Sequence, residues 1–345
     1  MRSVVLAAGC GARAGAAGWI GAGCCAAVFA IVAMALAGCA RKQPPVPVVG
    51  VLMVDDFRQP TVDGLVDQLT EFDYLPDRNI RYVVKNAKGD TAAMPGLARD
   101  LVALRPNVIC PVGGVGAQAC IPLATNAGIP VVYMGVTHPK DLGIAVSDTQ
   151  PLPNTTGVRT GFTERMPKRL ELITFFFPTV KTVTVLYTTS ERPSVESLAL
   201  CEEAGPKLGL AITGLQLNND ADARQIAASM SKEKYELLLG TPNTALQRAR
   251  KAVVIPAAVR AGIRFFGIDR DATLDGAEVS YGPSLYSFGT QGARMVLKVL
   301  QGTRPETMPI ELPDTVELSV NMKTARQIGL EFPPRMLGLA DFMIR

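Results

Sequence analysis

The chain has 345 residues, of which 48% are hydrophobic and 19% are charged, and its formal net charge is +4. Two of these positive charges belong to Arg2 and Arg13 near the N-terminus, so the rest of the chain is close to neutral. The hydrophobic content excludes a disordered chain. The absence of any Lys/Arg cluster argues against a nucleic-acid partner.

The N-terminal segment has the pattern of an export signal. A basic start and an apolar run over residues 19–36 precede Leu36-Ala37-Gly38-Cys39, and together they resemble a bacterial lipoprotein signal with its lipobox. Residues 1–38 are therefore expected to be a signal peptide, and Cys39 is expected to carry the lipid as the first residue of the mature protein. An uncleaved anchor is the alternative, because the run is nearly as long as the roughly 20 residues that span a bilayer. In both cases the remainder lies outside the cytoplasm, held on the polar, proline-rich linker 39–47.

From Val48 onward, short apolar runs alternate with longer amphipathic ones. Strands are predicted over 48–54, 80–84, 108–112 and 130–134, with helices over 61–72, 91–104 and 115–127 between them. After a polar stretch over 148–156, helices are predicted over 165–176, 194–208, 220–230 and 244–261, alternating with strands over 182–187, 211–217, 237–240, 264–268 and 277–281. A late helix over 285–300 and an extended segment over 309–320 follow. Serial β-α-β units with fully apolar strands indicate two lobes, each built on a parallel sheet covered on both faces.

The cysteines and the single histidine limit the chemistry that the chain can carry. Cys110, Cys120 and Cys201 are scattered and form no disulfide framework. Buried free thiols are the favoured interpretation, and a bridge between Cys110 and Cys120 is the alternative. Because His138 is the only histidine and no cysteine pair has ligand spacing, neither a metal site nor a cofactor is predicted.

Ligands of parallel α/β sheets bind beyond the carboxyl ends of the strands, where backbone N–H groups are free. These positions are 55–57, 113–115, 135–138, 188–191, 241–244 and Asp269, and most of them carry small or hydroxylic side chains. Such residues suit a small polar solute. For Thr189, Ser190 and Thr244, helix capping is the competing interpretation. Asp55, Asp56 and Asp269 are each either a solvated surface charge or a ligand contact, and Asp269 has a better claim to contact than the other two because it directly follows the apolar run 265–268.

Two other functions, dinucleotide binding and catalysis, are less well supported by the sequence. Residues 114–119 fit G-x-G-x-x-A, a dinucleotide fingerprint, but they follow the third strand and no acid ends a strand at the required distance. A tight turn that exposes N–H groups to a ligand is preferred. No hydrolase, P-loop or zincin motif occurs, and His138 beside Pro139 is better explained as a loop or cleft-wall residue than as a general base.

The order of several segments resembles one family. These segments are 49–52, 86–90, 135–139, 154–158, 183–191, 241–244, 267–269 and 321–325. Together they are similar to the substrate-binding proteins of ABC transporters of the tryptophan/tyrosine type, over residues 48–333. The resemblance implies a two-lobe, type I periplasmic-binding-protein-like fold with three interlobe crossings. The N-terminal lobe would comprise 48–157 plus 283–308, and the C-terminal lobe 158–282 plus 309–345.

The resemblance also implies a function. A small polar solute, an amino acid or a related compound, would bind between the lobes, which close by a hinge motion and present the solute to an ABC permease and its ATPase. The solute contacts that it implies are Asp56, Gly114, Gln118 and Thr137 on the first lobe and Ser190, Glu191, Ser194, Thr241, Asn243, Thr244 and Asp269 on the second. His138, which departs from the family pattern, is a further candidate contact that would alter specificity. Asp269 would pair with the ammonium of an amino acid, while hydroxyls and helix N-terminal N–H groups hold its carboxylate.

The chain also departs from the family pattern. Gly113-Gly114-Val115-Gly116 stands where relatives have a run of proline or alanine, and Pro242 and His138 each replace an expected aspartate. The last two changes remove acids from the presumed cleft. The alternative function is a sensory or scaffold lipoprotein that uses the same fold to signal to a membrane partner, and an extracytoplasmic enzyme comes third.

Overall fold

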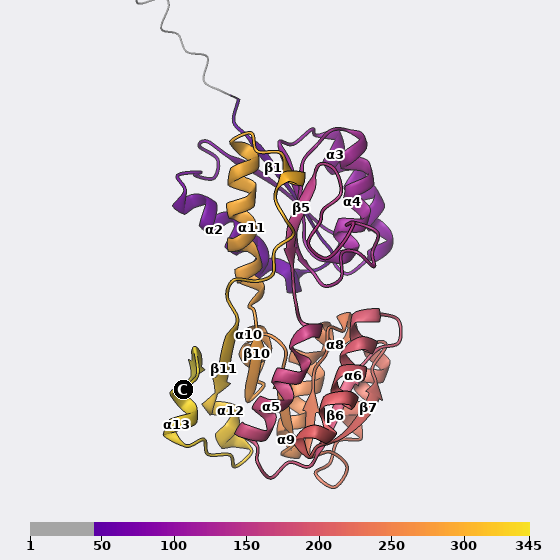
Figure 1. The fold of residues 1–345 in the computed structure, drawn as a ribbon, viewed down its shortest axis with the longest axis vertical. Helices are drawn as coiled ribbons and strands as arrows, with labels where there is room; N and C mark the ends of the chain where they lie inside the picture. Colours follow the sequence, from indigo (N-terminus) through magenta and orange to yellow (C-terminus); the bar gives the residue numbers. More distant parts are fainter. Residues whose placement is uncertain (1–44) are drawn as a thin grey trace, which may run out of the picture. The chain divides into compact units, whose positions relative to one another are not determined.

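A computed structural model of the protein describes residues 45–345 and contains two sheets built mainly of parallel strands (Figure 1). The signal peptide, Cys39 and most of the linker lie outside the described residues. The first sheet has the order β2-β1-β3-β4-β5, and all its neighbours pair in parallel. Its strands are β1 (Val48–Met53), β2 (Arg81–Asn86), β3 (Val108–Pro111), β4 (Val131–Val136) and β5 (Thr155–Arg159).

Helices cover both faces of this sheet. Successive side chains of each strand point to opposite faces, so each face packs into a core of its own. Val49 and Val51 of β1 pack with residues of α2 (Gln59–Glu71) and α11 (Leu285–Leu300). Leu52, on the opposite face, packs with α3 (Met94–Ala103) and α4 (Gly114–Asn126). β1 leads into α2 and β3 leads into α4. Because β1 and β3 are parallel, the loops at their carboxyl ends lie at the same edge of the sheet.

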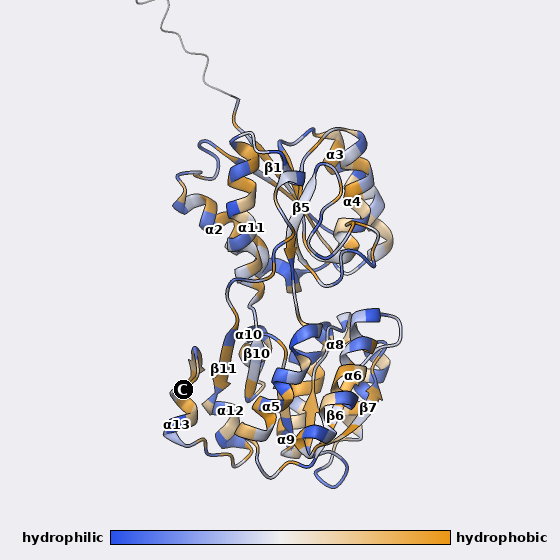
Figure 2. Cartoon of the chain, in the orientation of Figure 1, coloured by the Kyte–Doolittle hydropathy of each residue, from blue (hydrophilic) through white to orange (hydrophobic). Residues whose placement is uncertain are grey.

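The second sheet has seven strands in the order β12-β11-β10-β9-β8-β6-β7. Its strands are β6 (Thr182–Tyr187), β7 (Ala211–Gln216), β8 (Leu237–Leu239), β9 (Arg264–Gly267), β10 (Val279–Gly282), β11 (Glu317–Asn321) and β12 (Phe342–Ile344). Among the described strands of this sheet, only the β10–β11 pairing is antiparallel. Because β12 pairs in parallel with β11, β11 and β12 both run opposite to the other five strands. The helices of this half are α5 (Met166–Phe176), α6 (Arg192–Ala204), α7 (Asp220–Ala228), α8 (Thr244–Ala249), α9 (Ile255–Ala261), α10 (Arg270–Leu274), α12 (Met322–Gln327) and α13 (Pro334–Leu337), and a π-helical turn, Arg250–Val254, joins α8 to α9. Figure 2 shows apolar residues on the strands and polar residues on the outer turns of the helices.

The chain passes between the two sheets three times. It leaves the first sheet after β5, returns between β10 and α11, and leaves again before β11. Val158 of β5 still forms a bridge with Glu311, and β5 reaches Arg159, so residues 158–159 and 311 belong to the first sheet. The predicted fold class, two lobes of helix-flanked sheet with three crossings, is confirmed.

The predicted elements agree closely with the structure up to β10, with two omissions, β5 and α10, and the single helix predicted over 244–261 is divided into α8 and α9 by the π-helical turn. A polar stretch is predicted over 148–156 and no element over 157–159, yet residues 155–159 form β5, in which the buried Thr155 and Thr156 hydroxyls donate to the Leu152 and Met308 carbonyls. The predicted extended segment 309–320 is a strand only from Glu317. Three short C-terminal elements, α12, α13 and β12, have no counterpart in the prediction.

The thiols are buried and unbridged, so the favoured interpretation is confirmed and the Cys110–Cys120 bridge is not formed. Burial raises the pKa of Cys120 and of Cys201 to about 12, which keeps both protonated and unreactive. Within residues 45–345, no helix combines the length and the apolar character that crossing a membrane requires.

Candidate functional site

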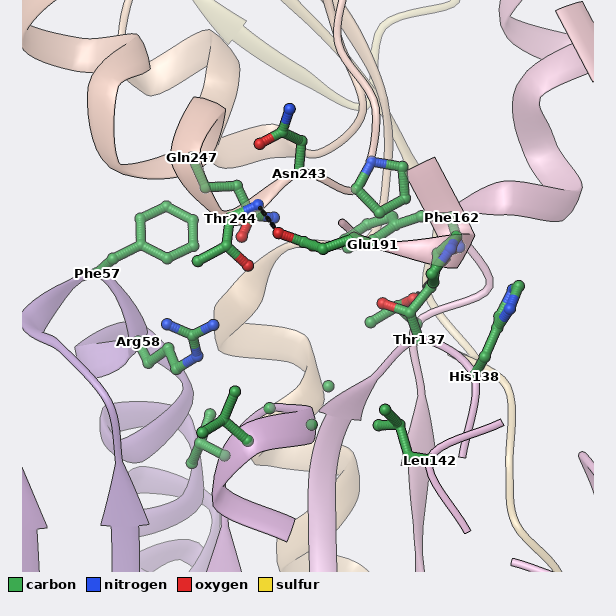
Figure 3. A pocket seen from close by; sticks show the side chains of 18 of the residues that line it. Phe57, Arg58, Thr137, His138, Leu142, Phe162, Glu191, Asn243, Thr244 and Gln247 are labelled. Atoms are coloured by element: carbon green, nitrogen blue, oxygen red, sulfur yellow. Dashed lines mark hydrogen bonds between the residues drawn. The ribbon is translucent and has the colours of Figure 1, made fainter. Parts of the chain in front are cut away.

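A cavity of about 670 Å³ lies between the strand ends of the two halves (Figure 3). The first half lines it with the loops after β1, β3 and β4, and the second half lines it with the loops after β6, β7 and β8. Every one of these loops follows the carboxyl end of a parallel strand. The cavity is therefore at the place where an α/β sheet offers free helix N-termini and loop side chains to a ligand.

The first-lobe side of the cavity carries positive charge. Gly113 precedes α4 with φ +80° and provides no side-chain cap, so the first N–H groups of this helix are free of a side-chain partner. A Cβ at Gly113 would lie 2.8 Å from Arg58 Nε, which means that the guanidinium packs directly on this turn. Arg58 Nη1 donates to Asp55 Oδ1 at 2.8 Å, and this contact holds the side chain in place. A helix N-terminus beside an arginine suits an anionic group.

The second-lobe side carries a carboxylate. Glu191 precedes α6, and its Oε1 accepts a hydrogen bond from the Thr244 N–H at 2.9 Å, at the start of α8. In the described part of the chain this carboxylate forms no ion pair, and Figure 3 shows Glu191 among the residues that line the cavity. It is therefore available to a cationic group of a ligand.

Aromatic rings form the apolar part of the wall. Phe162 and Phe288 meet edge to face with centroids 6.0 Å apart, and both line the cavity. Phe57 lies on the first-lobe side and contacts the guanidinium of Arg250 from the second half, 5.1 Å from its ring centroid. A ligand in this cavity meets charge at two places and apolar surface elsewhere.

Eight of the twelve predicted contact residues line the cavity. These are Gly114, Gln118, Thr137, His138, Ser190, Glu191, Asn243 and Thr244. Asn243 also caps α8, because its Oδ1 accepts the Leu246 N–H at 3.0 Å, and its Nδ2 donates to the Leu217 carbonyl. It is thus held by backbone on two sides.

Asp56, Ser194 and Thr241 lie outside the cavity lining. Asp56 is on the exposed surface, where it pairs with Lys88 at 2.8 Å. Ser194 Oγ and Thr241 Oγ1 are buried and lie 2.7 Å apart. Ser194 accepts the Thr188 N–H, and Thr241 donates to the Leu186 carbonyl, so both side chains fix the loops behind the cavity.

Asp269 is also buried away from the cavity, and its expected pairing with a ligand ammonium does not fit this placement. Arg250 Nη1 donates to both Asp269 oxygens at 2.8 and 3.0 Å, and Asp269 also caps α10 through the Ala272 N–H. Burial alone lowers the pKa of Arg250, but the charges of Asp269 and Asp275 outweigh this and raise it. Glu191, rather than Asp269, is the carboxylate that the structure exposes to the cavity.

The sequence prediction missed several residues that line the cavity, among them Arg58, Phe162, Gln247 and Phe288. Phe57 lies in the predicted ligand-facing segment 55–57, and Arg58 comes directly after it. Phe162 and Phe288 lie at or near crossings between the sheets. No local pattern in the sequence marks a crossing, because a crossing is defined by which elements belong to which lobe. Phe162 and Phe288 therefore could not be predicted as cavity residues.

Two lobes of parallel sheet, three crossings and a cavity of mixed charge at the strand ends define a solute-binding protein of the periplasmic type I class. The chain belongs to the ABC transporter substrate binding protein family, whose model matches residues 48–344.

Individual relatives agree with this assignment. A tyrosine-binding protein of Clostridioides difficile (strain R20291) is 22% identical over 270 residues, which cover 78% of this chain and 76% of that protein. A conserved domain protein of Vibrio cholerae O1 biovar eltor has a similar structure, with a TM-score of 0.75, 25% identity, and coverage of 86% of this chain and 99% of that one. An ABC domain from Streptococcus pneumonia in complex with L-Trp has a TM-score of 0.73 at 20% identity, again covering 86% and 99% of the two chains.

Proposed function

We propose that this protein is the extracytoplasmic, lipid-anchored subunit of an ABC importer, and that it captures an aromatic α-amino acid between its lobes for delivery to a membrane permease. The observation that carries the proposal is the charge pattern of the cavity. Arg58 and the N-terminus of α4 lie on the first-lobe side, and Glu191 lies on the second-lobe side (Figure 3). A zwitterion complements both.

The remaining contacts suit an aromatic side chain. Phe57, Phe162 and Phe288 offer ring surfaces, and edge-to-face or stacked rings add to the gain from burying apolar area. The polar groups near them, among them Gln247 and Asn218, can bind a hydroxyl or an indole N–H. The relatives support this solute class, since one is a tyrosine-binding protein and another was solved with L-Trp.

Membrane attachment and delivery complete the proposal. The lipobox-like residues 36–39 support a lipid on Cys39, and the proline-rich segment that follows supports a spacer. Because the two lobes contribute opposite charges to one ligand, binding would favour the arrangement in which they are close together. A permease could then distinguish loaded from empty protein. No step in this function requires catalysis.

The experiment compares ligands that differ by one charged group. L-Tyrosine and L-tryptophan are expected to raise the Tm of the purified protein, since a ligand at 100 times its Kd stabilises the native state by about 2.7 kcal/mol. Tyramine and tryptamine lack the carboxylate, and the corresponding arylpropionates lack the ammonium, so all four are expected to bind more weakly. Equal binding of the arylpropionates and the amino acids would contradict the role of Glu191.

Glu191→Gln removes the charge with little change of shape. Because a hydrogen bond to a charged group contributes about 1.5–3 kcal/mol, calorimetric titration is expected to show roughly 10- to 100-fold weaker binding of L-tyrosine or L-tryptophan. Glu203→Gln is the matched control, since Glu203 is exposed on α6, away from the cavity lining, and pairs with Lys207. Equal affinities in the two variants would contradict the proposal.

A further inference from the structure

Three side chains, of which His138 and Asp141 line the cavity, bring metal-binding atoms together. His138 Nδ1, one oxygen of Asp141 and one oxygen of Glu196 all lie within 4.8 Å of one another. His138 Nδ1 is 3.1 Å from Asp141 Oδ2 and 3.3 Å from Glu196 Oε2. The side chains are 14%, 25% and 35% exposed, so the group is partly shielded from water.

The two distances from the histidine nitrogen match the edges of a zinc coordination polyhedron. Bonds of about 2.0–2.1 Å in a tetrahedron place neighbouring ligand atoms roughly 3.3 Å apart. Hydrogen bonding explains the arrangement less completely, because one ring nitrogen carries at most one proton and cannot donate fully to two carboxylates. A divalent cation would satisfy all three atoms at once, with water or a ligand in the fourth position.

Arg192 contacts both carboxylates but leaves the inner oxygens free. Arg192 Nη1 donates to Asp141 Oδ1 at 3.1 Å, and Arg192 Nε donates to Glu196 Oε1 at 2.6 Å. These are the oxygens that face away from His138, so the guanidinium orients both carboxylates as an outer-shell partner does. Its side chain is 68% exposed, which allows it to move outward when a metal binds.

The three side chains come from different lobes. His138 and Asp141 follow β4 in the first half, whereas Glu196 lies on α6 in the second half. We infer that His138, Asp141 and Glu196 form a binding site for a divalent transition metal, with Zn²⁺ the best match to one imidazole and two carboxylates, and that bound metal holds the two lobes together. The sequence contains no motif for this site, because Asp141 is 3 positions from His138 but Glu196 is 58 positions away and belongs to the other lobe.

The test uses Zn²⁺ alone, with no amino acid present, so that its outcome is independent of solute capture. The purified protein is titrated with Zn²⁺ in competition with a fluorescent chelator, and its radius of gyration is measured by X-ray scattering with and without the metal. One Zn²⁺ per chain and a smaller radius are expected, and millimolar Mg²⁺ is expected not to compete, because it prefers all-oxygen sites.

The variants separate a bridging site from a site on one lobe. His138→Ala and Glu196→Gln are each expected to weaken Zn²⁺ binding at least tenfold and to abolish the change of radius. Glu203→Gln, on the same helix as Glu196, should bind like the wild type. Wild-type affinity no higher than that of His138→Ala would overturn the site, and full affinity in Glu196→Gln would overturn its bridging of the two lobes.

Discussion

Glu278 is a carboxyl group without exposure to water. Its Oε2 accepts the Phe265 N–H at 2.7 Å, while its Oε1 is buried without a partner. Burial raises the pKa of Glu278 to about 8, although the hydrogen bond from Phe265 acts in the opposite direction. At neutral pH the folded protein therefore holds a proton that the unfolded chain, with an ordinary glutamate pKa of 4.5, has released.

This proton predicts a pH dependence of stability. Since the folded state binds more protons than the unfolded state between about pH 4.5 and 8, the free energy of unfolding is expected to fall as the pH rises through this window. The contribution of Glu278 has a slope of at most about 1.4 kcal/mol per pH unit. In Glu278→Gln this part of the slope should vanish, which urea unfolding at pH 5, 6, 7 and 8 measures. Identical slopes in the two proteins would contradict the assignment.

For single residues, the sequence predicted which loops face the cavity better than it predicted what each side chain does there. The loops after the strands were located correctly, and Glu191 and His138 were among the residues that line the cavity. Asp269 was also expected there, because it follows an apolar strand, but Arg250 binds it inside the protein. Arg250 belongs to another element, 19 positions earlier, and no local pattern shows which of several acids an arginine will pair with.

The helices α2 and α11 approach so closely that only glycine fits between them. A Cβ on Gly289 would lie 2.0 Å from the Thr61 carbonyl oxygen, and one on Gly64 would lie 2.3 Å from the Tyr286 carbonyl oxygen. The adjacent Thr61 hydroxyl donates to the Leu285 carbonyl at 2.9 Å. This contact fixes α11, which begins directly after the second crossing, against α2, the helix that Arg58 directly precedes.

Gly289→Ala is expected to force these helices apart and to lower the free energy of unfolding by about 1–3 kcal/mol. Gly96→Ala on α3 is the matched control, because a Cβ there meets only the end of the Arg99 side chain, at 3.9 Å. Alanine in that helix is expected to be neutral or stabilising. Chemical denaturation of both variants checks the prediction, and equal stabilities would contradict it.

Arg169 of α5 joins two of the crossings. It is fully buried, and it donates to the carbonyls of Phe162, Tyr281 and Ile268. Phe162 lies in the first crossing and Tyr281 lies at the approach to the second. Burial lowers the pKa of Arg169 to about 9, yet the group stays protonated at neutral pH and holds these backbone segments together.

Arg169→Met is expected to leave three buried carbonyls without their donor, each of which costs about 1–3 kcal/mol. The free energy of unfolding should fall by about 3 kcal/mol or more. Lys168→Ala, the adjacent exposed residue paired with Glu171, should change it by less than about 1 kcal/mol. Thermal and urea unfolding measure both variants. A loss of less than about 1 kcal/mol in the free energy of unfolding of Arg169→Met, similar to that of Lys168→Ala, would refute the role of Arg169.

Most elements could be predicted because their apolar periodicity is local. The helix over 285–300 matches α11 at both ends, since Pro283 and Gly302 bound a strongly amphipathic run. β5 was missed because Thr155, Thr156 and Gly157 give no strand pattern, and their burial depends on residues near 308–311, about 150 positions away. Short elements such as β12 likewise form through tertiary contacts with β11.

For the whole molecule, the alternation of strands and helices was sufficient to predict two lobes, and the late helix and strand were sufficient to suggest repeated crossing. The same patterns could not predict which residues of the two lobes face each other across the cavity. Arg58 and Glu191 come from opposite halves, and so do His138 and Glu196. Their proximity follows from the assembled fold.

The central claim is that an aromatic α-amino acid binds between the lobes. A crystal structure of the protein grown with saturating L-tyrosine or L-tryptophan tests it most directly. The account predicts electron density for the amino acid in the cavity, with its ammonium on Glu191 and its carboxylate at Arg58 and the first turn of α4. An empty cavity at saturation, or an amino acid bound elsewhere on the protein, would contradict it.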